Sequence, residues 1–94
     1  MQLEGSAMKL FMKPVDMLCF HTAVGILHPV RFKWLETDGT EHVVNIDRVL
    51  TVGDEKFAGN PMRVFVVQSC IDKVERRFEM KYEIKSAVWY LSRM

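Results

Sequence analysis

The sequence is poor in cysteine and has almost no net charge, and each shortage excludes a class of protein. Cys19 and Cys70 are its two cysteines, and they lie too far apart to suggest the disulfide framework of a small secreted domain. The formal net charge of +1 creates no overall field that would attract nucleic acid or an anionic membrane. Any such binding would have to rest on a local patch.

Long apolar runs and targeting patterns are also missing. No stretch approaches the roughly 20 apolar residues that a membrane-spanning helix needs, and the N-terminus lacks the basic and then apolar pattern of a signal peptide. The opening MQLEGSA is mostly polar and resembles residues added for expression or a frayed end. We therefore expect a cytoplasmic protein without membrane contact, in which residues 1–12 are a disordered N-terminus or added residues.

Motifs that carry known chemistries are absent as well. Neither GxxxxGK[ST] nor GxGxxG occurs, so no phosphate-binding loop is predicted. Cys19 and His21 share one face of a candidate strand, where His28, His42 and Cys70 could in principle join them, but this spacing fits no standard zinc site. No orienting group for a Cys/His nucleophile is apparent. Free cysteine is often buried, so we interpret both cysteines as small core residues and expect no enzyme, no cofactor and no metal.

One alternation of polar and apolar residues dominates what is present. Residues Val74–Lys85 read VERRFEMKYEIK, with charges of alternating sign at every odd position. In a helix these charges would stack on like charges at i,i+4. A strand sends them to one face and sends Phe78, Met80 and Tyr82 to the other. The pattern predicts a half-buried strand, and a hydrophobic content of 49% leaves apolar surface for a partner or for self-association to cover.

The rest of the chain divides into similar segments. Residues 13–94 are short enough to form a single domain, and turn signals such as Asp38-Gly39 separate segments rich in strand formers. We expect an all-β fold, a small antiparallel meander of about six strands curled into an SH3-like or similar small barrel. The expected strands are Pro14–Thr22, Pro29–Thr37, Thr40–Thr51, Met62–Ile71, Val74–Lys85 and Ala87–Arg93.

Two irregularities are predicted within this plan. The apolar phase of Thr40–Thr51 changes between Ile46 and Val49, which indicates a β-bulge near Asp47-Arg48. Gly53–Pro61 reads as the longest irregular segment, with room for one short helical turn. Neither irregularity changes the predicted fold class.

The best candidates for a basic patch that binds nucleic acid or a partner are Arg31, Lys33, Lys56 and Arg63. Small barrels bind single strands through a positive groove with exposed stacking aromatics. Phe32 and Trp34 alternate with the first two cations along one strand. Because alternation places these aromatics on the opposite face from the cations, we assign the aromatics to the core and the cations to a solvated face.

A succession of aromatic and aliphatic positions gives one further clue. The succession is Pro29-x-x-Phe32-x-Trp34, Ile46-x-x-Val49-Leu50, Phe78-Glu79-x-Lys81-Tyr82-Glu83 and Trp89-x-Leu91. It resembles short uncharacterised bacterial proteins over roughly residues 29–93, some of which are encoded beside translesion-type DNA polymerases. The resemblance implies an accessory role in DNA damage tolerance. It implies no catalysis and transfers no functional residue, and the loop Gly53–Pro61 departs from it.

These observations predict a small non-enzymatic interaction or accessory module that works with a protein partner or a second copy. The missing catalytic motifs, the short chain and the high apolar fraction support this hypothesis. The alternative is a β-barrel that binds single-stranded nucleic acid through the four cations, with an affinity that falls as salt rises. A metal site or small enzyme centre around Cys19 and His21 is the third hypothesis.

Overall fold

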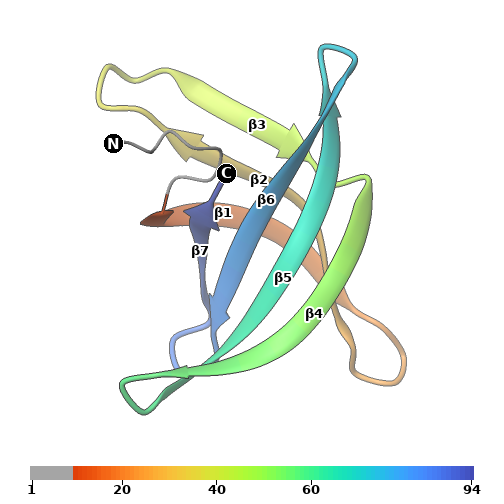
Figure 1. The fold of residues 1–94 in the computed structure, drawn as a ribbon, viewed down its shortest axis with the longest axis vertical. Coiled ribbons are helices and arrows are strands. Elements are labelled where there is room, and N and C mark those ends of the chain that lie inside the picture. Colours follow the sequence, from red (N-terminus) through yellow and green to blue (C-terminus); the bar gives the residue numbers. More distant parts are fainter. Residues whose placement is uncertain (1–9) are drawn as a thin grey trace.

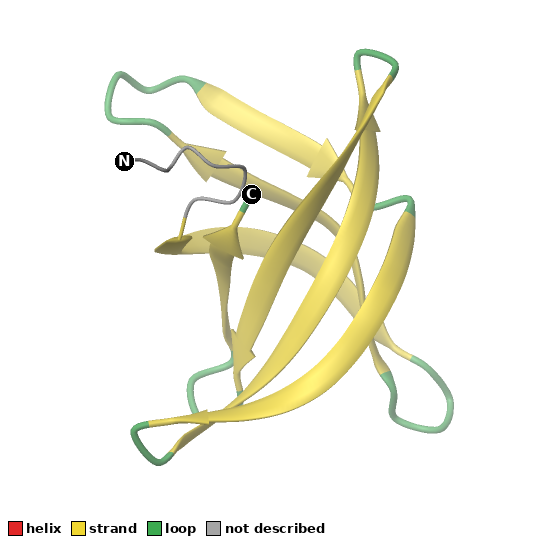
Figure 2. Ribbon diagram, viewed as in Figure 1, coloured by secondary structure: helices red, strands yellow, loops and turns green. Residues whose placement is uncertain are grey.

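The computed structural model describes residues 10–94, with only the backbone of Leu10, Phe11 and Phe57. These residues form seven β-strands (Figure 1) and no helix (Figure 2), which confirms the all-β prediction. The strands are β1 Leu10–His21, β2 Leu27–Leu35, β3 Glu41–Asn45, β4 Arg48–Phe57, β5 Asn60–Ile71, β6 Val74–Glu83 and β7 Val88–Arg93. Of the predicted disordered N-terminus, residues 1–9 lie outside the described part and residues 10–12 belong to β1.

All strands join one antiparallel sheet in the order β3-β2-β1-β7-β6-β5-β4. The sheet consists of two meanders, β1–β3 and β4–β7, each made of strands that are consecutive in the chain. Strand β1 connects them, because its first half pairs with β7, with Leu10 opposite Arg93, and its second half pairs with β2 from Asp16 to His21. The sheet curls into a half-barrel (Figure 1), so the barrel-like fold is confirmed, with two meanders in place of the expected single one.

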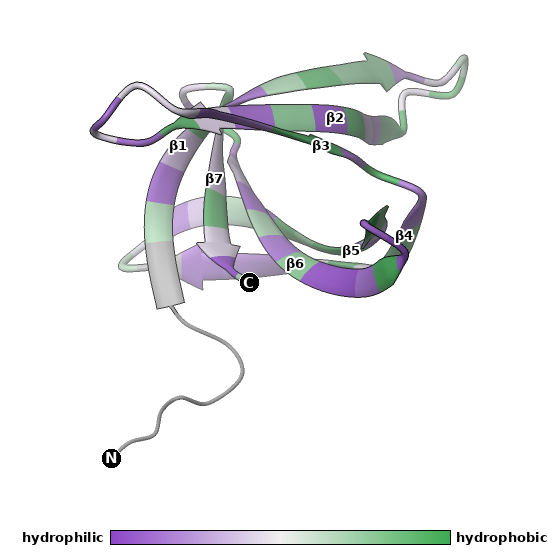
Figure 3. Cartoon of the chain, turned by 90° about the horizontal axis from the view of Figure 1, so that it is seen from above, coloured by the Kyte–Doolittle hydropathy of each residue, from purple (hydrophilic) through white to green (hydrophobic). Residues whose placement is uncertain are grey.

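The core fills the inner side of the curled sheet. Seen from above, β2 and β3 lie on one side and β5 and β6 on the other, with β1 and β7 running between them (Figure 3). Phe32 of β2 is 1% exposed and meets Phe78 of β6 edge to face, with ring centroids 5.5 Å apart. The other buried members of this cluster are Leu27, Val44, Phe65, Val67, Met80, Trp89 and Leu91. One shared core therefore holds the two meanders together.

The charged strand β6 has the orientation that its alternation predicts. Phe78 and Met80 are buried and Tyr82 is half-buried against the same cluster. The strand ends at Glu83, and the backbone N–H of Ala87 donates to the Glu83 carbonyl at 2.9 Å to close the following turn. The predicted half-buried strand is therefore confirmed, and it stops two residues before the predicted end.

The predicted strand Thr40–Thr51 is wrong in one respect, because the chain turns a corner inside it. The bulge predicted at Asp47-Arg48 is the point where β3 has ended and β4 begins. Strands β3 and β4 are the two edges of the sheet, so residues 46–47 carry the chain from one edge to the other. The phase change between Ile46 and Val49 is therefore a change of strand. A β-bulge or similar irregularity of register follows in β4, between Val49 and Thr51, and lies after the predicted position.

Backbone hydrogen bonds fix this corner from both meanders. Ile46 donates its N–H to the carbonyl of Val30 in β2 at 2.8 Å, and Asp47 donates to the carbonyl of Gln68 in β5 at 2.9 Å. The Asp47 carboxylate also accepts the N–H of Cys70 at 2.7 Å. Consecutive residues are thus tied to strands of different meanders.

The prediction of an irregular segment at Gly53–Pro61 is also wrong, because the segment is a β-hairpin. Strand β4 continues to Phe57, and β5 begins at Asn60 after the two residues Ala58 and Gly59. These two residues have φ angles of 52° and 84°, as a tight primed turn between antiparallel strands requires. Alanine rarely adopts a positive φ, and the charged residues before it have low strand propensity, so the sequence carries no hairpin signal here.

Replacement of Asp47 by alanine tests the corner. The variant loses the carboxylate that accepts the Cys70 N–H, and we expect the free energy of unfolding to fall by about 1–2 kcal/mol. Urea unfolding followed by tryptophan fluorescence measures the change. Asp54→Ala is the control, because Asp54 makes an exposed ion pair with Arg63, and such pairs contribute about 0–1 kcal/mol. A larger loss in the control than in Asp47→Ala would contradict the role of the corner.

Candidate functional site

Two of the predicted cations, Arg31 and Lys33, lie on the solvent side of β2. Alternation along the strand predicts this side for them. Their register neighbours on β1 and β3 are Leu18 and Asn45 for Arg31, and Asp16 and Val43 for Lys33. The two cations therefore occupy the middle strand of a three-stranded surface.

The other two predicted cations do not join this surface. Lys56 is on β4 and Arg63 is on β5, and the strands β1, β7 and β6 lie between β2 and β5 in the sheet order. Arg63 is paired with Asp54 across the β4–β5 hairpin, with Nε 3.2 Å from Oδ1. The structure therefore divides the predicted basic patch into two pairs of cations on different meanders.

The solvent side of β1–β3, which we call the outer face, carries a shallow hollow of about 440 Å³. The exposed residues of the outer face include Asp16, Leu18 and Phe20 of β1, Arg31, Lys33 and Leu35 of β2, and Glu41 and Val43 of β3. A second hollow of about 360 Å³ lies beside the first, shares Asp16, Lys33 and Glu41 with it, and extends to Lys13 and Trp34. The outer face is thus a mixed surface of charged and apolar side chains.

Apolar exposure is concentrated on this part of the molecule. Among the described residues, eleven large apolar side chains are exposed, and six of them lie between Leu18 and Val43 in the chain. Four are on the outer face and are between 51% and 60% exposed, and Val24 and Ile26 in the loop between β1 and β2 are 81% and 59% exposed. An antiparallel sheet with one packed side normally presents polar residues on its other side. This clustered apolar exposure makes the outer face the candidate functional site.

The charges of the outer face are balanced in number, but only some of them are paired. Lys33 Nζ lies 3.3 Å from Glu41 Oε2. Within residues 10–94, Asp16 and Arg31 make no ion pair. In the described chain, a carboxylate and a guanidinium therefore remain free for an external partner beside the half-exposed Leu18.

Phe20 is one of the residues of the outer face that the sequence pattern does not predict. Its ring is 51% exposed, and its centroid lies 5.0 Å from that of the His28 ring. Strand β1 is apolar on both sides, with Val15, Met17 and Cys19 packed against the core. Alternation therefore could not show which side of β1 faces solvent.

The aromatic residues of β2 lie on the packed side, as predicted. Phe32 is buried, and Trp34 is half-buried. The Trp34 ring stacks on Phe32 at 6.0 Å and on His42 at 4.7 Å between ring centroids. These rings support the sheet from inside and leave Phe20 as the exposed aromatic of the outer face.

The structure does not bring Cys19 and His21 into a metal site. Cys19 is half-buried and His21 is exposed, and no three His, Cys, Asp or Glu side chains among residues 10–94 come close enough to hold one metal ion. Cys70 is exposed, which corrects its predicted place in the core. It lies near the end of β5, where residues 72–77 of the following hairpin are exposed too.

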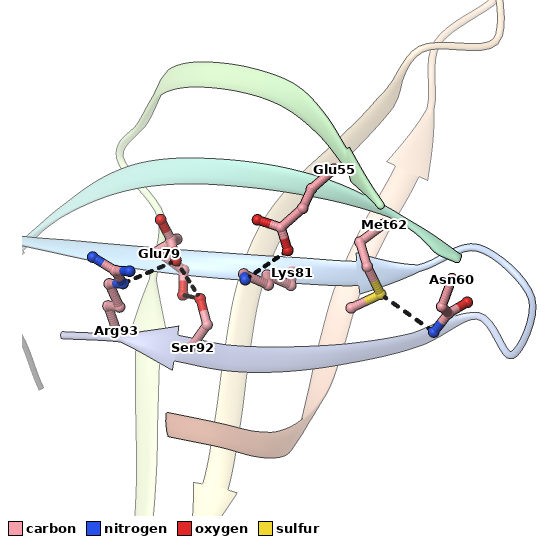
Figure 4. Close-up of polar contacts among 7 residues, drawn as sticks. All are labelled: Glu55, Asn60, Met62, Glu79, Lys81, Ser92 and Arg93. Carbon is pink, nitrogen blue, oxygen red and sulfur yellow. Dashed lines mark hydrogen bonds and ion pairs between the residues drawn. The ribbon is translucent and has the colours of Figure 1, made fainter. Parts of the chain in front are cut away.

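A partly buried polar cluster lies on β4, β6 and β7 (Figure 4). Lys81 Nζ lies 2.8 Å from Glu55 Oε2, and the Lys81 side chain is 14% exposed. Glu79 accepts a hydrogen bond from Ser92 Oγ at 2.8 Å and pairs with Arg93 Nε at 3.4 Å. Each charged group of this cluster is satisfied by a neighbour, so we interpret the cluster as structural.

Comparison with known proteins adds no relative from which a function could be carried over. No protein-family model matches the chain, and neither a curated protein nor a solved structure matches it. No helix in residues 10–94 has the length and apolar character that crossing a bilayer requires. Function therefore has to be argued from the outer face itself.

Glu83, at the end of β6, makes the stability of the fold sensitive to acid. Hydrogen bonds from Ser86 and then from Asn60 hold the pKa of its carboxyl below the ordinary value. A carboxylate whose pKa is lowered by folding stabilises the fold above the unfolded pKa, about 4.3 for glutamate. That contribution is lost as the pH falls through the folded pKa.

The variant Glu83→Gln tests this dependence. We expect the difference in unfolding free energy between the unaltered chain and the variant to be largest near neutral pH and to shrink as the pH falls through the lowered pKa. Urea unfolding near neutral pH and again well below the ordinary glutamate pKa, about 4.3, measures the difference. A difference that is the same at both pH values would contradict the assignment.

Proposed function

We propose that this chain is a non-enzymatic interaction module that binds a protein partner through its outer face. The observation that supports the proposal is the apolar exposure on β1–β3, where Leu18, Phe20, Leu35 and Val43 each leave about half or more of their surface open. A folded monomer gains nothing from exposing these side chains, whereas a partner that covers them gains about 25 cal/mol per Å² of apolar surface.

The charge of the outer face favours protein over nucleic acid. Arg31 and Lys33 are balanced by Asp16 and Glu41, so the net charge of the face is near zero. A phosphate backbone is bound through an excess of cations. Protein interfaces instead combine apolar and aromatic side chains with few charges, among which arginine is enriched.

The biological process in the proposal rests on the sequence resemblance over roughly residues 29–93. Some proteins of similar pattern are encoded beside translesion-type polymerases, so we place the module in DNA damage tolerance, in the cytoplasm. Its role there is to bind and position a partner, because exposed apolar side chains of the outer face are suited to contact with another protein.

Photo-crosslinking from the outer face tests the proposal. Val43 on this face and Val74 at the β5–β6 hairpin are both 52% exposed, so a benzoylphenylalanine at either position has similar access to a partner. We expect a discrete protein adduct in cells from position 43 and none from position 74. Leu18→Asp should then weaken binding of the captured protein by about tenfold or more, as the loss of a central apolar contact does. Equal capture from both positions, or binding that Leu18→Asp leaves unchanged, would contradict the proposal.

Binding of single-stranded nucleic acid is the second candidate function, and one observation favours it. The exposed ring of Phe20 lies on the same side of the sheet as Arg31 and Lys33. An exposed aromatic beside cations is the pattern by which small barrels stack and neutralise a single strand. The ion pair of Lys33 with Glu41 weakens this pattern.

Fluorescence anisotropy with a labelled single-stranded oligonucleotide at low salt tests the second candidate. If it holds, Phe20→Ala and Arg31→Ala each weaken binding several-fold, because one removes a stacking platform and the other a phosphate contact. The control Arg63→Ala, on the other meander, leaves binding unchanged. Absence of binding at low salt removes this candidate.

A further inference from the structure

We infer that the outer face is self-complementary and that a second copy of this chain is its occupant. The inference rests on the proposed function, because it names one partner for the same surface. In the dimer, Arg31 of each copy pairs with Asp16 of the other, and the Leu18 side chains of the two copies meet between these pairs.

The two free charges of the outer face are of opposite sign and lie in one hollow. Asp16 and Arg31 line the 440 Å³ hollow together with Leu18 and Val43, and within the described chain neither charge has an ion-pair partner. A guanidinium and a carboxylate can form two parallel hydrogen bonds. A second copy supplies the matching group to both charges at once, whereas a partner of one sign would satisfy only one of them.

The strand register shows how two copies fit. Leu18 lies opposite Arg31 and Asp16 lies opposite Lys33, so these four side chains form a quadrilateral. Arg31 and Asp16 occupy one diagonal, roughly 7–8 Å long. A two-fold axis in the plane of the face, along the other diagonal, exchanges the positions of these two residues. Each guanidinium then faces a carboxylate of the second copy, as a symmetric interface requires.

The residues near the axis meet their own counterparts. Leu18 is 53% exposed, and contact between the two leucines removes apolar surface from water. Lys33 meets a like charge, but Glu41 of its own copy lies 3.3 Å from its ammonium and offsets the repulsion. Val43, which is the register neighbour of Lys33 on β3, adds apolar contact.

Charge reversal distinguishes this dimer from association through any other surface. Arg31→Asp sets carboxylate against carboxylate, and Asp16→Arg sets guanidinium against guanidinium. Each variant alone should therefore self-associate about tenfold more weakly, or not at all. In an equal mixture, both contacts again join an acid to a base, so a mixed dimer should form with nearly the affinity of the unaltered chain. Sedimentation velocity over a concentration series measures all four cases.

Arg76→Asp is the matched control, because it makes the same change of charge at an exposed arginine of β6 and should leave the dimer intact. Recovery in the mixture also shows that both variants fold. The inference is overturned if the unaltered chain is a monomer throughout, if both reversals leave a dimer intact, or if the mixture stays monomeric. Should it fail while position 43 still captures a protein, the proposed function stands and only the second copy is excluded. If position 43 captures nothing either, both proposals fail.

Discussion

Strand β1 is the element on which the rest of the structure depends, because its ladder with β7 is the strand pairing that joins the two meanders in the sheet order of residues 10–94. Its first half completes the ladder with β7 and its second half the ladder with β2. The same strand also contributes to the core, because Val15, opposite Trp89 of β7, and Met17, opposite Phe32 of β2, pack against the buried cluster. The corner at residues 46–47 is the second connection between the meanders, through one backbone N–H donated to each and through the Asp47 carboxylate, which accepts the N–H of Cys70.

This arrangement packs one side of β1–β3 and leaves the other side to solvent. The inward residues of β1 account for its role in folding. The outward residues Leu18 and Phe20 have no such role in folding, because they are not packed against the core cluster and are about half exposed. These exposed apolar side chains, with the unpaired charges of Asp16 and Arg31 beside them, are the observations on which the proposed binding surface rests.

The sequence predicts those parts of the fold in which one side of a strand is polar. Alternation places the inward residues of β6 correctly, and it assigns Phe32 and the two cations beside it to the right sides of β2. It fails where a strand has no polar side, as in β1, so it does not predict the exposure of Phe20. It also fails at Ala58, where a residue without a turn preference adopts a positive φ, so the residue pattern does not predict the β4–β5 hairpin.

The candidate site could be predicted only in part for a different reason. Which non-consecutive strands pair is decided by the whole core, not by local residue pattern. Nothing in the sequence shows that β7 returns to β1, or that three strands separate Arg31 from Arg63 in the sheet order. Two of four predicted cations therefore share the outer face, while the carboxylate and the apolar residues around them become apparent only from the register.

The pairing of Leu10 with Arg93 has a topological consequence. The two ends of the described chain lie side by side, and the sheet read from β4 runs β4-β5-β6-β7-β1-β2-β3, which is sequence order with a shifted start. A circular permutant that joined these ends and opened at residues 46–47 would be an uninterrupted up-and-down ribbon, with every strand beside its neighbour in the chain. In the chain as it stands, the first strand, β1, is the fifth strand of that ribbon. The corner at residues 46–47 links the two edge strands, β3 and β4, covalently.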